Sequence, residues 1–173
     1  MSTTIDLYHP SHDEQISVLF CCLGNICRSP MAEAAFRDTV EKLGYADRFS
    51  RIDSCGTAGY HVGAEPDHRT IEMLRKNGIT TDHCARQVAQ KDFKNFDYIL
   101  AMDTSNLSNL KRIEPKSGKA KVMLFGYFDG NKRKEIVEDP YYGGNSGFTE
   151  NFAQVVRFSK NFVREVLQVE IPE

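Results

Sequence analysis

The sequence predicts a single α/β domain in which a four-stranded parallel sheet is flanked by helices. Its 173 residues match the length of one ordinary domain. Hydrophobic residues make up 40% of the chain, which is enough apolar material for a core. Four short apolar runs alternate with stretches of helical periodicity. This alternation is typical of parallel strands joined by right-handed helical crossovers.

The first strand and the helix after it have the clearest patterns. Residues 16–21 form a nearly continuous apolar run, as expected for a strand buried on both faces of a parallel sheet. Ser29 and Pro30 predict a helix start, because serine caps free amides and proline at the first helical position gives up an N–H that has no partner. Apolar residues follow at helical spacing until Gly44, which predicts the helix end.

The same alternation continues to the end of the chain. The last segment carries phenylalanine, valine and leucine at helical spacing, so we expect its apolar face to pack on the sheet. The remaining predicted strands are 49–54, 98–102 and 121–125, and the remaining predicted helices are 66–77, 105–112 and 150–169.

Composition excludes several classes of partner. The chain has 22 Lys and Arg against 24 Asp and Glu, a net charge of −2, and no basic block that would neutralise a nucleic-acid backbone. No apolar stretch reaches the roughly 18 residues that a bilayer requires. Residues 1–15 are a polar leader without the pattern of a secretion signal. We expect a leader at 1–15 and a domain at 16–173, in a cytoplasmic monomer or weak homodimer without nucleic-acid or membrane partners.

The five cysteines point to thiol chemistry. Three of them, Cys21, Cys22 and Cys27, lie within seven residues, and the total is odd. Such a set is typical of reactive thiols in a reducing compartment and not of a disulfide framework.

The segment from Cys22 to Ser29 has the features of a phosphate-binding loop. It follows a strand and opens a helix, so its amides and the helix dipole favour a tetrahedral anion. Arg28 can clamp two phosphate oxygens, and a Cys22 thiolate below them would be a nucleophile for phosphoryl transfer. The alternative is a buried structural cysteine beside a surface arginine. The other residues of the predicted cup are Leu23, Gly24, Asn25, Ile26 and Cys27.

Two motifs resemble those of the low-molecular-weight protein tyrosine phosphatases. The first is Cys-Leu-Gly-Asn-Ile-Cys-Arg-Ser-Pro at 22–30, followed by Met-Ala-Glu at 31–33, and the second is Asp-Pro-Tyr-Tyr at 139–142. The resemblance runs from about Ile16 to the last helix. It implies a flavodoxin-like fold, a phosphocysteine intermediate on Cys22, Asp139 as general acid and base, and no metal or cofactor. The implied activity is hydrolysis of phosphotyrosine and aryl phosphates, including acid phosphatase activity.

The resemblance also assigns a supporting network around the loop. Asn25 is expected in a left-handed conformation, held by Ser29, Ser54 and His83. Ser29 is expected to donate to the Cys22 sulfur, with an ordinary helix cap as the alternative. Asp103 follows the third predicted strand and either orients Arg28 or caps the next helix.

Aromatic walls are expected to select the substrate. Leu23, Ile26, Tyr60 and Tyr142 would frame a slot deep enough for phosphotyrosine and too deep for phosphoserine. The expected substrates are therefore phosphotyrosine proteins or small aryl phosphates. Tyr141 and Tyr142 are themselves possible phosphorylation sites, as in some family members.

Cys27 suggests a redox role, because it lies five residues after Cys22 on the same loop. It would trap an oxidised Cys22 as a disulfide, and the alternative is a small buried side chain.

Two other functions share this loop. A thiol-dependent arsenate reductase of the same fold would need two further neighbouring cysteines, and no cysteine follows Cys84. A phosphotyrosine-binding module without turnover would not need Cys22, Arg28 and Asp139 together. Phosphoarginine and flavin mononucleotide also remain open as substrates.

Overall fold

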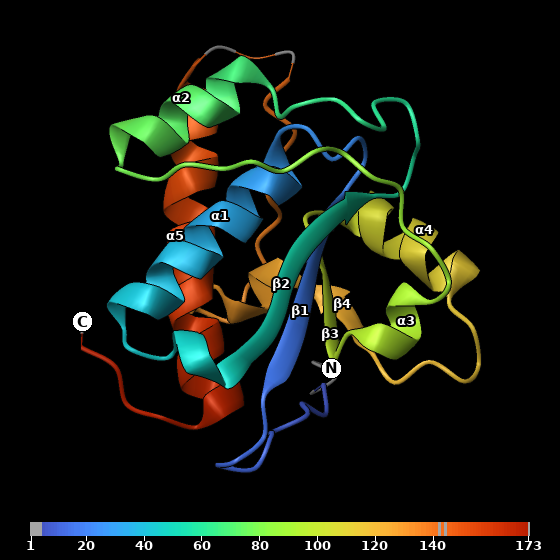
Figure 1. Cartoon of the computed structure of the whole chain (residues 1–173), viewed down its shortest axis with the longest axis vertical. Helices are drawn as coiled ribbons and strands as arrows, with labels where there is room; N and C mark the ends of the chain where they lie inside the picture. Colours follow the sequence, from blue (N-terminus) through green and yellow to red (C-terminus); the bar gives the residue numbers. More distant parts are fainter. Residues whose placement is uncertain (1–4, 142, 144, 173) are drawn as a thin grey trace.

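The computed structural model describes residues 5–141, 143 and 145–172. Four parallel strands form one sheet, as the sequence predicts, and the structure shows their order to be β2-β1-β3-β4. Helices α1, α2 and α5 lie on one side of the sheet, and α3 and α4 lie on the other (Figure 1). The strands are β1 (Ile16–Cys22), β2 (Phe49–Gly56), β3 (Tyr98–Ala101) and β4 (Lys121–Leu124), the α-helices are α1 (Arg28–Lys42), α2 (His68–Lys76), α3 (Asp92–Asn95), α4 (Thr104–Ile113) and α5 (Asn145–Leu167), and the 3₁₀ turns are η1 (Ala46–Arg48) and η2 (Phe125–Phe128).

Strand β1 is buried on both faces, which explains its continuous apolar run. Val18 and Phe20 face the larger core with α1 and α5, while Leu19 and Cys21 face the smaller core with α3 and α4. Because side chains alternate along a strand, a central strand between two helical layers needs apolar residues at nearly every position.

The order of the strands determines where a ligand can bind. After β1 the chain moves to β2 on one side of β1, and it later crosses to β3 on the other side. Ligands of open α/β sheets bind beyond the carboxyl ends of the strands at such a switch point. Cys22 ends β1 and Asp103 follows β3, so both lie at this point, which is at the upper end of the sheet in Figure 1.

Several helix boundaries differ from the sequence prediction. Helix α1 begins at Arg28 with Cys27 as its N-cap, so the prediction that Ser29 caps it is wrong. Helix α2 begins at His68, capped by Asp67, and not at residue 66. Helix α5 begins at Asn145 and ends at Leu167. The short helix α3 was not predicted, because four residues are too few to show a helical period.

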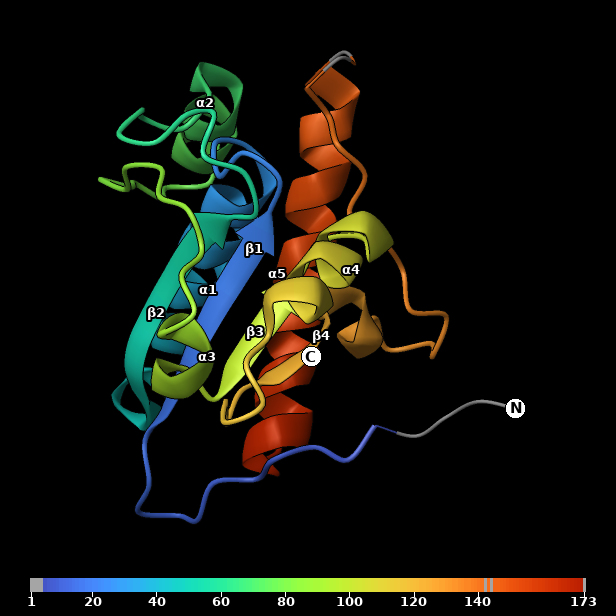
Figure 2. The ribbon, with the colours of Figure 1, turned by 90° about the vertical axis from the view of Figure 1, so that its right-hand side faces the viewer.

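The described part of the leader folds back under the sheet, at the bottom of Figure 2. The Tyr98 hydroxyl accepts from the Tyr8 amide at 2.8 Å and donates to the Tyr8 carbonyl at 2.7 Å. His9 Nδ1 lies 3.0 Å from the Val166 carbonyl. These contacts attach the leader at the end of the sheet opposite Cys22. Among the described residues, no helix has the length and apolarity needed to cross a bilayer.

Candidate active site

Six residues of the predicted phosphate loop at 22–29 line a cavity of about 390 Å³ at the carboxyl end of the sheet. The cavity brings Cys22 and Arg28 together with Asp139, which is more than a hundred residues away in sequence. Its lining residues are Cys22, Leu23, Gly24, Ile26, Cys27, Arg28, Tyr60, His61, Asp139 and Tyr141.

The Cys22 sulfur lies among hydrogen-bond donors. The side chain is only 3% exposed. Its Sγ is 3.0 Å from the Ser29 hydroxyl and accepts from the Asn25 amide at 3.3 Å. The N-terminus of α1 begins within the same loop, so the positive end of the helix dipole adds to these donors. Donors and positive potential at this position can stabilise negative charge that develops on the sulfur.

Asn25 has the left-handed conformation that the sequence predicted, with φ at 58°. Its Nδ2 donates to the hydroxyls of Ser29 at 2.8 Å and Ser54 at 3.1 Å. Its Oδ1 accepts from His83 Nε2 at 2.7 Å and from the Arg86 amide at 2.9 Å. These contacts offset the cost of left-handed backbone at a residue other than glycine, which is on the order of 1–2 kcal/mol.

Glu33 completes this network and was not assigned a role from the sequence. Its Oε1 accepts from the Ser54 hydroxyl at 2.8 Å and lies 3.2 Å from His83 Nδ1. Glu33 is 4% exposed and lies one helical turn after Ser29. A charged residue within the run Met-Ala-Glu-Ala-Ala-Phe was the available signal, because carboxylates are almost never fully buried without partners.

One group of described residues has the composition of a metal site. Ligand atoms of Glu33, Asp53 and His83 lie within 4.8 Å of one another. Arginines already pair with both carboxylates: Arg37 is 3.0 Å from Glu33, and Arg86 is 3.1 Å from Asp53. Because their positive charge disfavours a further cation, we interpret the group as support for the Asn25 network.

Arg28 is buried and held by Asp103 and by the Val137 carbonyl. It is 3% exposed, and its NH1 donates to Asp103 Oδ2 at 2.6 Å and to the Val137 carbonyl at 3.0 Å. Its NH2 lies 3.8 Å from Asp139 Oδ2. Asp103 fulfils both sequence expectations, because its other oxygen, Oδ1, accepts from the Asn106 amide and caps α4.

Residues 136–141, which we call the Asp139 loop, contribute Asp139 and Tyr141 to the cavity lining. The Asp139 side chain is 41% exposed, and its Oδ1 accepts from the Tyr141 amide at 3.0 Å. Arg69 links this loop to the phosphate loop: it donates to the Tyr141 carbonyl at 3.1 Å and binds Asp67 through two nitrogens. The Asp67 amide in turn donates to the Ile26 carbonyl at 2.7 Å.

The cavity walls agree in part with the sequence prediction. Leu23, Ile26 and Tyr60 line the cavity, with Leu23 39% and Tyr60 76% exposed. Tyr142 lies outside the described residues. His61 and Tyr141 also line the cavity and were not predicted as walls. His61 packs close to Gly24, where an added Cβ would lie 2.9 Å from its ring, and nothing in the sequence marked this contact.

Cys27 lies at the edge of the cavity but differs from Cys22 in its surroundings. Burial raises the pKa of its thiol to about 12, and the charges of Asp67 and Cys22 act in the same direction. Its thiol is therefore protonated at neutral pH. Cys84 is exposed, whereas Cys21 and Cys55 are buried.

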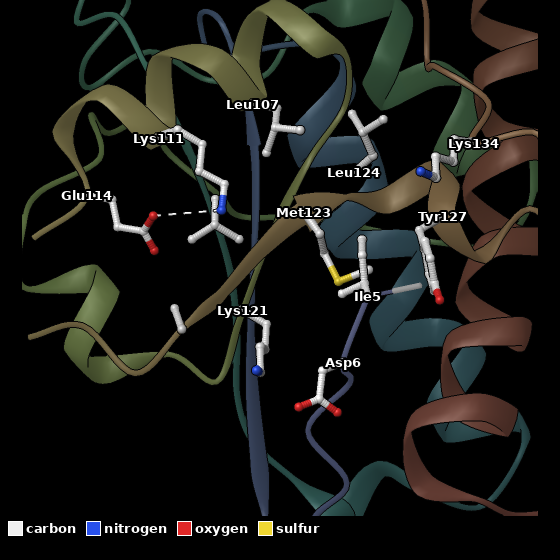
Figure 3. A pocket seen from close by; sticks show the side chains of 12 residues that line it. Ile5, Asp6, Leu107, Lys111, Glu114, Lys121, Met123, Leu124, Tyr127 and Lys134 are labelled. Atoms are coloured by element: carbon white, nitrogen blue, oxygen red, sulfur yellow. Dashed lines mark ion pairs between the residues drawn. The ribbon is translucent and has the colours of Figure 1, made fainter. Parts of the chain in front are cut away.

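A second cavity of about 440 Å³ lies at the edge of the sheet beside β4 (Figure 3). Its lining combines apolar side chains such as Leu107 and Met123 with Lys111, which lies 3.8 Å from Glu114. It contains none of the residues predicted for the active site. We therefore place the chemistry in the Cys22 cavity.

An α/β sheet with a cysteine and an arginine in a loop at its switch point is typical of cysteine-dependent phosphatases. Comparison with known proteins agrees: residues 17–170 match the profile of the family described as low molecular weight phosphotyrosine protein phosphatase. The chain belongs to this family and is a phosphatase.

Individual relatives support the assignment over most of the chain. The low molecular weight phosphotyrosine protein phosphatase of Schizosaccharomyces pombe is 58% identical over 153 residues, which cover 88% of this chain and 98% of the relative. The crystal structure of Primo-1 matches with a TM-score of 0.82 at 43% identity, covering 88% of this chain and 99% of the other. The crystal structure of DARP, a Drosophila arginine phosphatase, matches with a TM-score of 0.79 at 39% identity, covering 85% of this chain and 95% of the other.

Proposed function

We propose that this protein hydrolyses phosphotyrosine and other aryl phosphates through a phosphocysteine intermediate, with Cys22 as nucleophile, Arg28 as phosphate clamp and Asp139 as general acid and base. The observation that carries the proposal is the shared cavity, in which Cys22 Sγ is surrounded by donors beneath Arg28 and Asp139. The proposed substrates are phosphotyrosine proteins or small aryl phosphates, and the proposed location is the cytoplasm.

In the first step the Cys22 thiolate attacks phosphorus. The S–P bond forms as the bond from phosphorus to the aryl oxygen breaks, and Asp139 gives its proton to the departing oxygen. Arg28 and the loop amides stabilise the charge on the phosphoryl oxygens. Because its side chain is 41% exposed, Asp139 can reach a leaving group at the cavity mouth.

In the second step water replaces sulfur on phosphorus. The Asp139 carboxylate takes a proton from the attacking water, the S–P bond breaks, and inorganic phosphate is released. The Ser29 hydroxyl, 3.0 Å from Cys22 Sγ, stabilises the departing thiolate. Its Oγ can meanwhile accept from Asn25 Nδ2, which leaves the single hydroxyl proton for the sulfur or for the Cys55 carbonyl, 3.2 Å away.

The depth of the site accounts for the proposed aryl selectivity. Cys22 is 3% exposed, while Tyr60 at the rim is 76% exposed. A flat aromatic ring extends a phosphate to the sulfur, whereas the short side chain of phosphoserine leaves its phosphorus too far above it. The arginine phosphatase among the structural relatives makes phosphoarginine a necessary comparison in any assay.

The proposal is tested by replacing the nucleophile and comparing it with a second cysteine of the same loop. Cys22→Ser should lose at least about 10⁴-fold in turnover, because a serine hydroxyl is not ionised at neutral pH. Cys27→Ser is the matched control and should retain most activity. Turnover is measured with para-nitrophenyl phosphate and a phosphotyrosine peptide, beside phosphoserine and phosphoarginine peptides. Turnover by Cys22→Ser at the parent rate would overturn the proposal.

A redox role for Cys27 forms part of the proposal. Peroxide oxidises the Cys22 thiolate to a sulfenic acid, which condenses with the Cys27 thiol to give a disulfide and water. Without Cys27, excess peroxide oxidises the sulfenic acid further to the irreversible sulfinic acid. After treatment with excess peroxide and addition of a thiol reductant, the parent protein should therefore recover activity and Cys27→Ser should not. Equal recovery of the two proteins would remove this role.

A further inference from the structure

Polar side chains fix the Asp139 loop by binding successive main-chain carbonyls. Gln154 Nε2 donates to the carbonyl of Ile136 at 3.0 Å, and Arg28 NH1 donates to that of Val137 at 3.0 Å. Asn151 Nδ2 donates to the carbonyl of Glu138 at 3.2 Å. Asn151 therefore holds the peptide group that directly precedes Asp139.

Asn151 occupies a position that would favour an apolar side chain. It is 3% exposed on α5, and within the described part of the chain its Oδ1 is buried without a hydrogen-bond partner. A buried amide oxygen left without a partner destabilises the fold. Among the described residues, the one hydrogen bond of this side chain goes to the carbonyl of Glu138, an exposed residue where water could replace the donor. Fold stability alone does not account for an asparagine here.

We propose that Asn151 is a positioning residue for Asp139. This inference rests on the proposed role of Asp139 as general acid. By fixing the Glu138 carbonyl, Asn151 restricts the rotation of the backbone that carries the Asp139 side chain. The other described contacts of the Asp139 carboxylate are its local bond to the Tyr141 amide and its 3.8 Å approach to Arg28. Arg28 and Arg69 hold carbonyls of the loop only two residues away, at Val137 and Tyr141. Proton transfer requires the acid within hydrogen-bond reach of the leaving oxygen, so a loosely held acid transfers its proton less well.

The inference predicts opposite effects on catalysis and on stability. In Asn151→Leu the buried oxygen without a partner is removed and a side chain of similar length fills the space. The freed Glu138 carbonyl is hydrated. We expect the thermal midpoint to stay the same or rise while acid catalysis falls. If Asn151 had a purely structural role, its replacement would lower the thermal midpoint and the activity together.

The experiment compares two leaving groups. kcat/KM reports the step in which the aryl oxygen leaves, and it is measured for phenyl phosphate, which needs protonation, and for para-nitrophenyl phosphate, which needs it much less. We expect Asn151→Leu to lower kcat/KM about 10-fold for phenyl phosphate and about 2-fold or less for para-nitrophenyl phosphate. The 10-fold loss is part of the roughly 10²–10⁴-fold acceleration that a positioned acid supplies. Asn151→Ala, which adds no volume, should show the same ratio if leucine does not fit.

A matched control lies on the same helix. Asn161 also donates to a single carbonyl, that of Phe128 at 2.9 Å, away from the cavity. Asn161→Leu should leave the ratio between the two substrates unchanged. Asp139→Ala gives the reference for complete loss of the acid. If Asp139→Ala keeps the parental ratio of kcat/KM between the two substrates, the acid role itself is wrong. If its ratio changes but both folded Asn151 variants keep the parent ratio, the positioning role is overturned.

Discussion

The two sides of the active site are built in different ways. The phosphate loop is contiguous in sequence, and Cys22, Asn25, Arg28 and Ser29 are each at most 3% exposed. The Asp139 loop is exposed at its functional residue and is held mainly through its backbone carbonyls, by side chains from α1, α2 and α5. One side has a fixed local geometry, and the other depends on distant helices.

This difference matches what each side must do. The phosphate loop has to present amides, the sulfur and Arg28 to a small anion whose shape never changes, so rigidity favours catalysis. Asp139 has to reach leaving groups of different size and then activate water. An exposed carboxylate on a backbone fixed from behind suits both tasks.

The largest expected effect comes from the rigid side. Arg28→Lys keeps the charge but loses the planar fork that can bind two phosphate oxygens and Asp103 together. We expect kcat/KM to fall about 10³-fold. Arg75→Lys, at a side chain 70% exposed on α2, is the control and should be neutral. Near-parental activity of Arg28→Lys would show that a point charge suffices and that the geometry of the loop is less demanding.

The next largest effect concerns the left-handed residue of the loop. Asn25→Ala and Asn25→Gly both lose the hydrogen bonds to Ser29, Ser54 and His83, so activity should fall about 10²-fold, the usual result of displacing a catalytic group by an ångström. Of the two variants, only Asn25→Ala is strained by the left-handed backbone, because glycine adopts this conformation without cost. Urea denaturation should therefore find the alanine variant less stable than the glycine variant by about 1 kcal/mol. Equal stabilities would mean that the loop relaxes when the network is lost.

A smaller effect is expected at Asp103, whose carboxylate both pairs with Arg28 and caps α4. Asp103→Asn keeps an oxygen that can cap α4 but loses the negative charge facing Arg28 at 2.6 Å. We expect kcat/KM to fall about 10-fold, since a hydrogen bond to a charged group contributes roughly 1.5–3 kcal/mol. The thermal midpoint should change little, because the cap remains. A large loss of stability with normal kcat/KM would assign Asp103 to the cap alone.

The smallest effect is on stability near the Asp139 loop. Hydrogen bonds from Arg157 lower the pKa of Glu135 from 4.5 to about 2. Because the folded pKa lies below the unfolded one, this pair stabilises the fold above pH 4.5, and the contribution is lost as the pH falls toward 2. The urea midpoint of the parent should therefore drop more steeply between these two pH values than that of Glu135→Gln. Both side chains are partly exposed, so added salt should reduce the difference. Identical pH profiles would contradict the assigned ion pair.

The local structure around Cys22 was predicted correctly from the sequence. The order strand, loop and helix around Cys22 follows from adjacent residues, and the structure shows it. Helix starts were less accurate. Ser29 has the character of a cap, yet its hydroxyl lies beside the Cys22 sulfur, because hydrogen bonds with the Asn25 amide and the Cys55 carbonyl fix its position. Glu33 and Asn151 were missed, since a polar residue on a buried helix face gives no indication of its partner.

The sequence by itself determined the alternation of strands and helices and the contents of the phosphate loop, because apolar periodicity and neighbouring residues act over a few positions. Only the tertiary structure decided which carboxylates meet Arg28, which residues hold Asn25 in its left-handed conformation, and how the Asp139 loop is fixed to α5. These contacts join residues from 13 to more than a hundred positions apart. They depend on how the helices pack on the sheet, and no local preference of the chain encodes that packing.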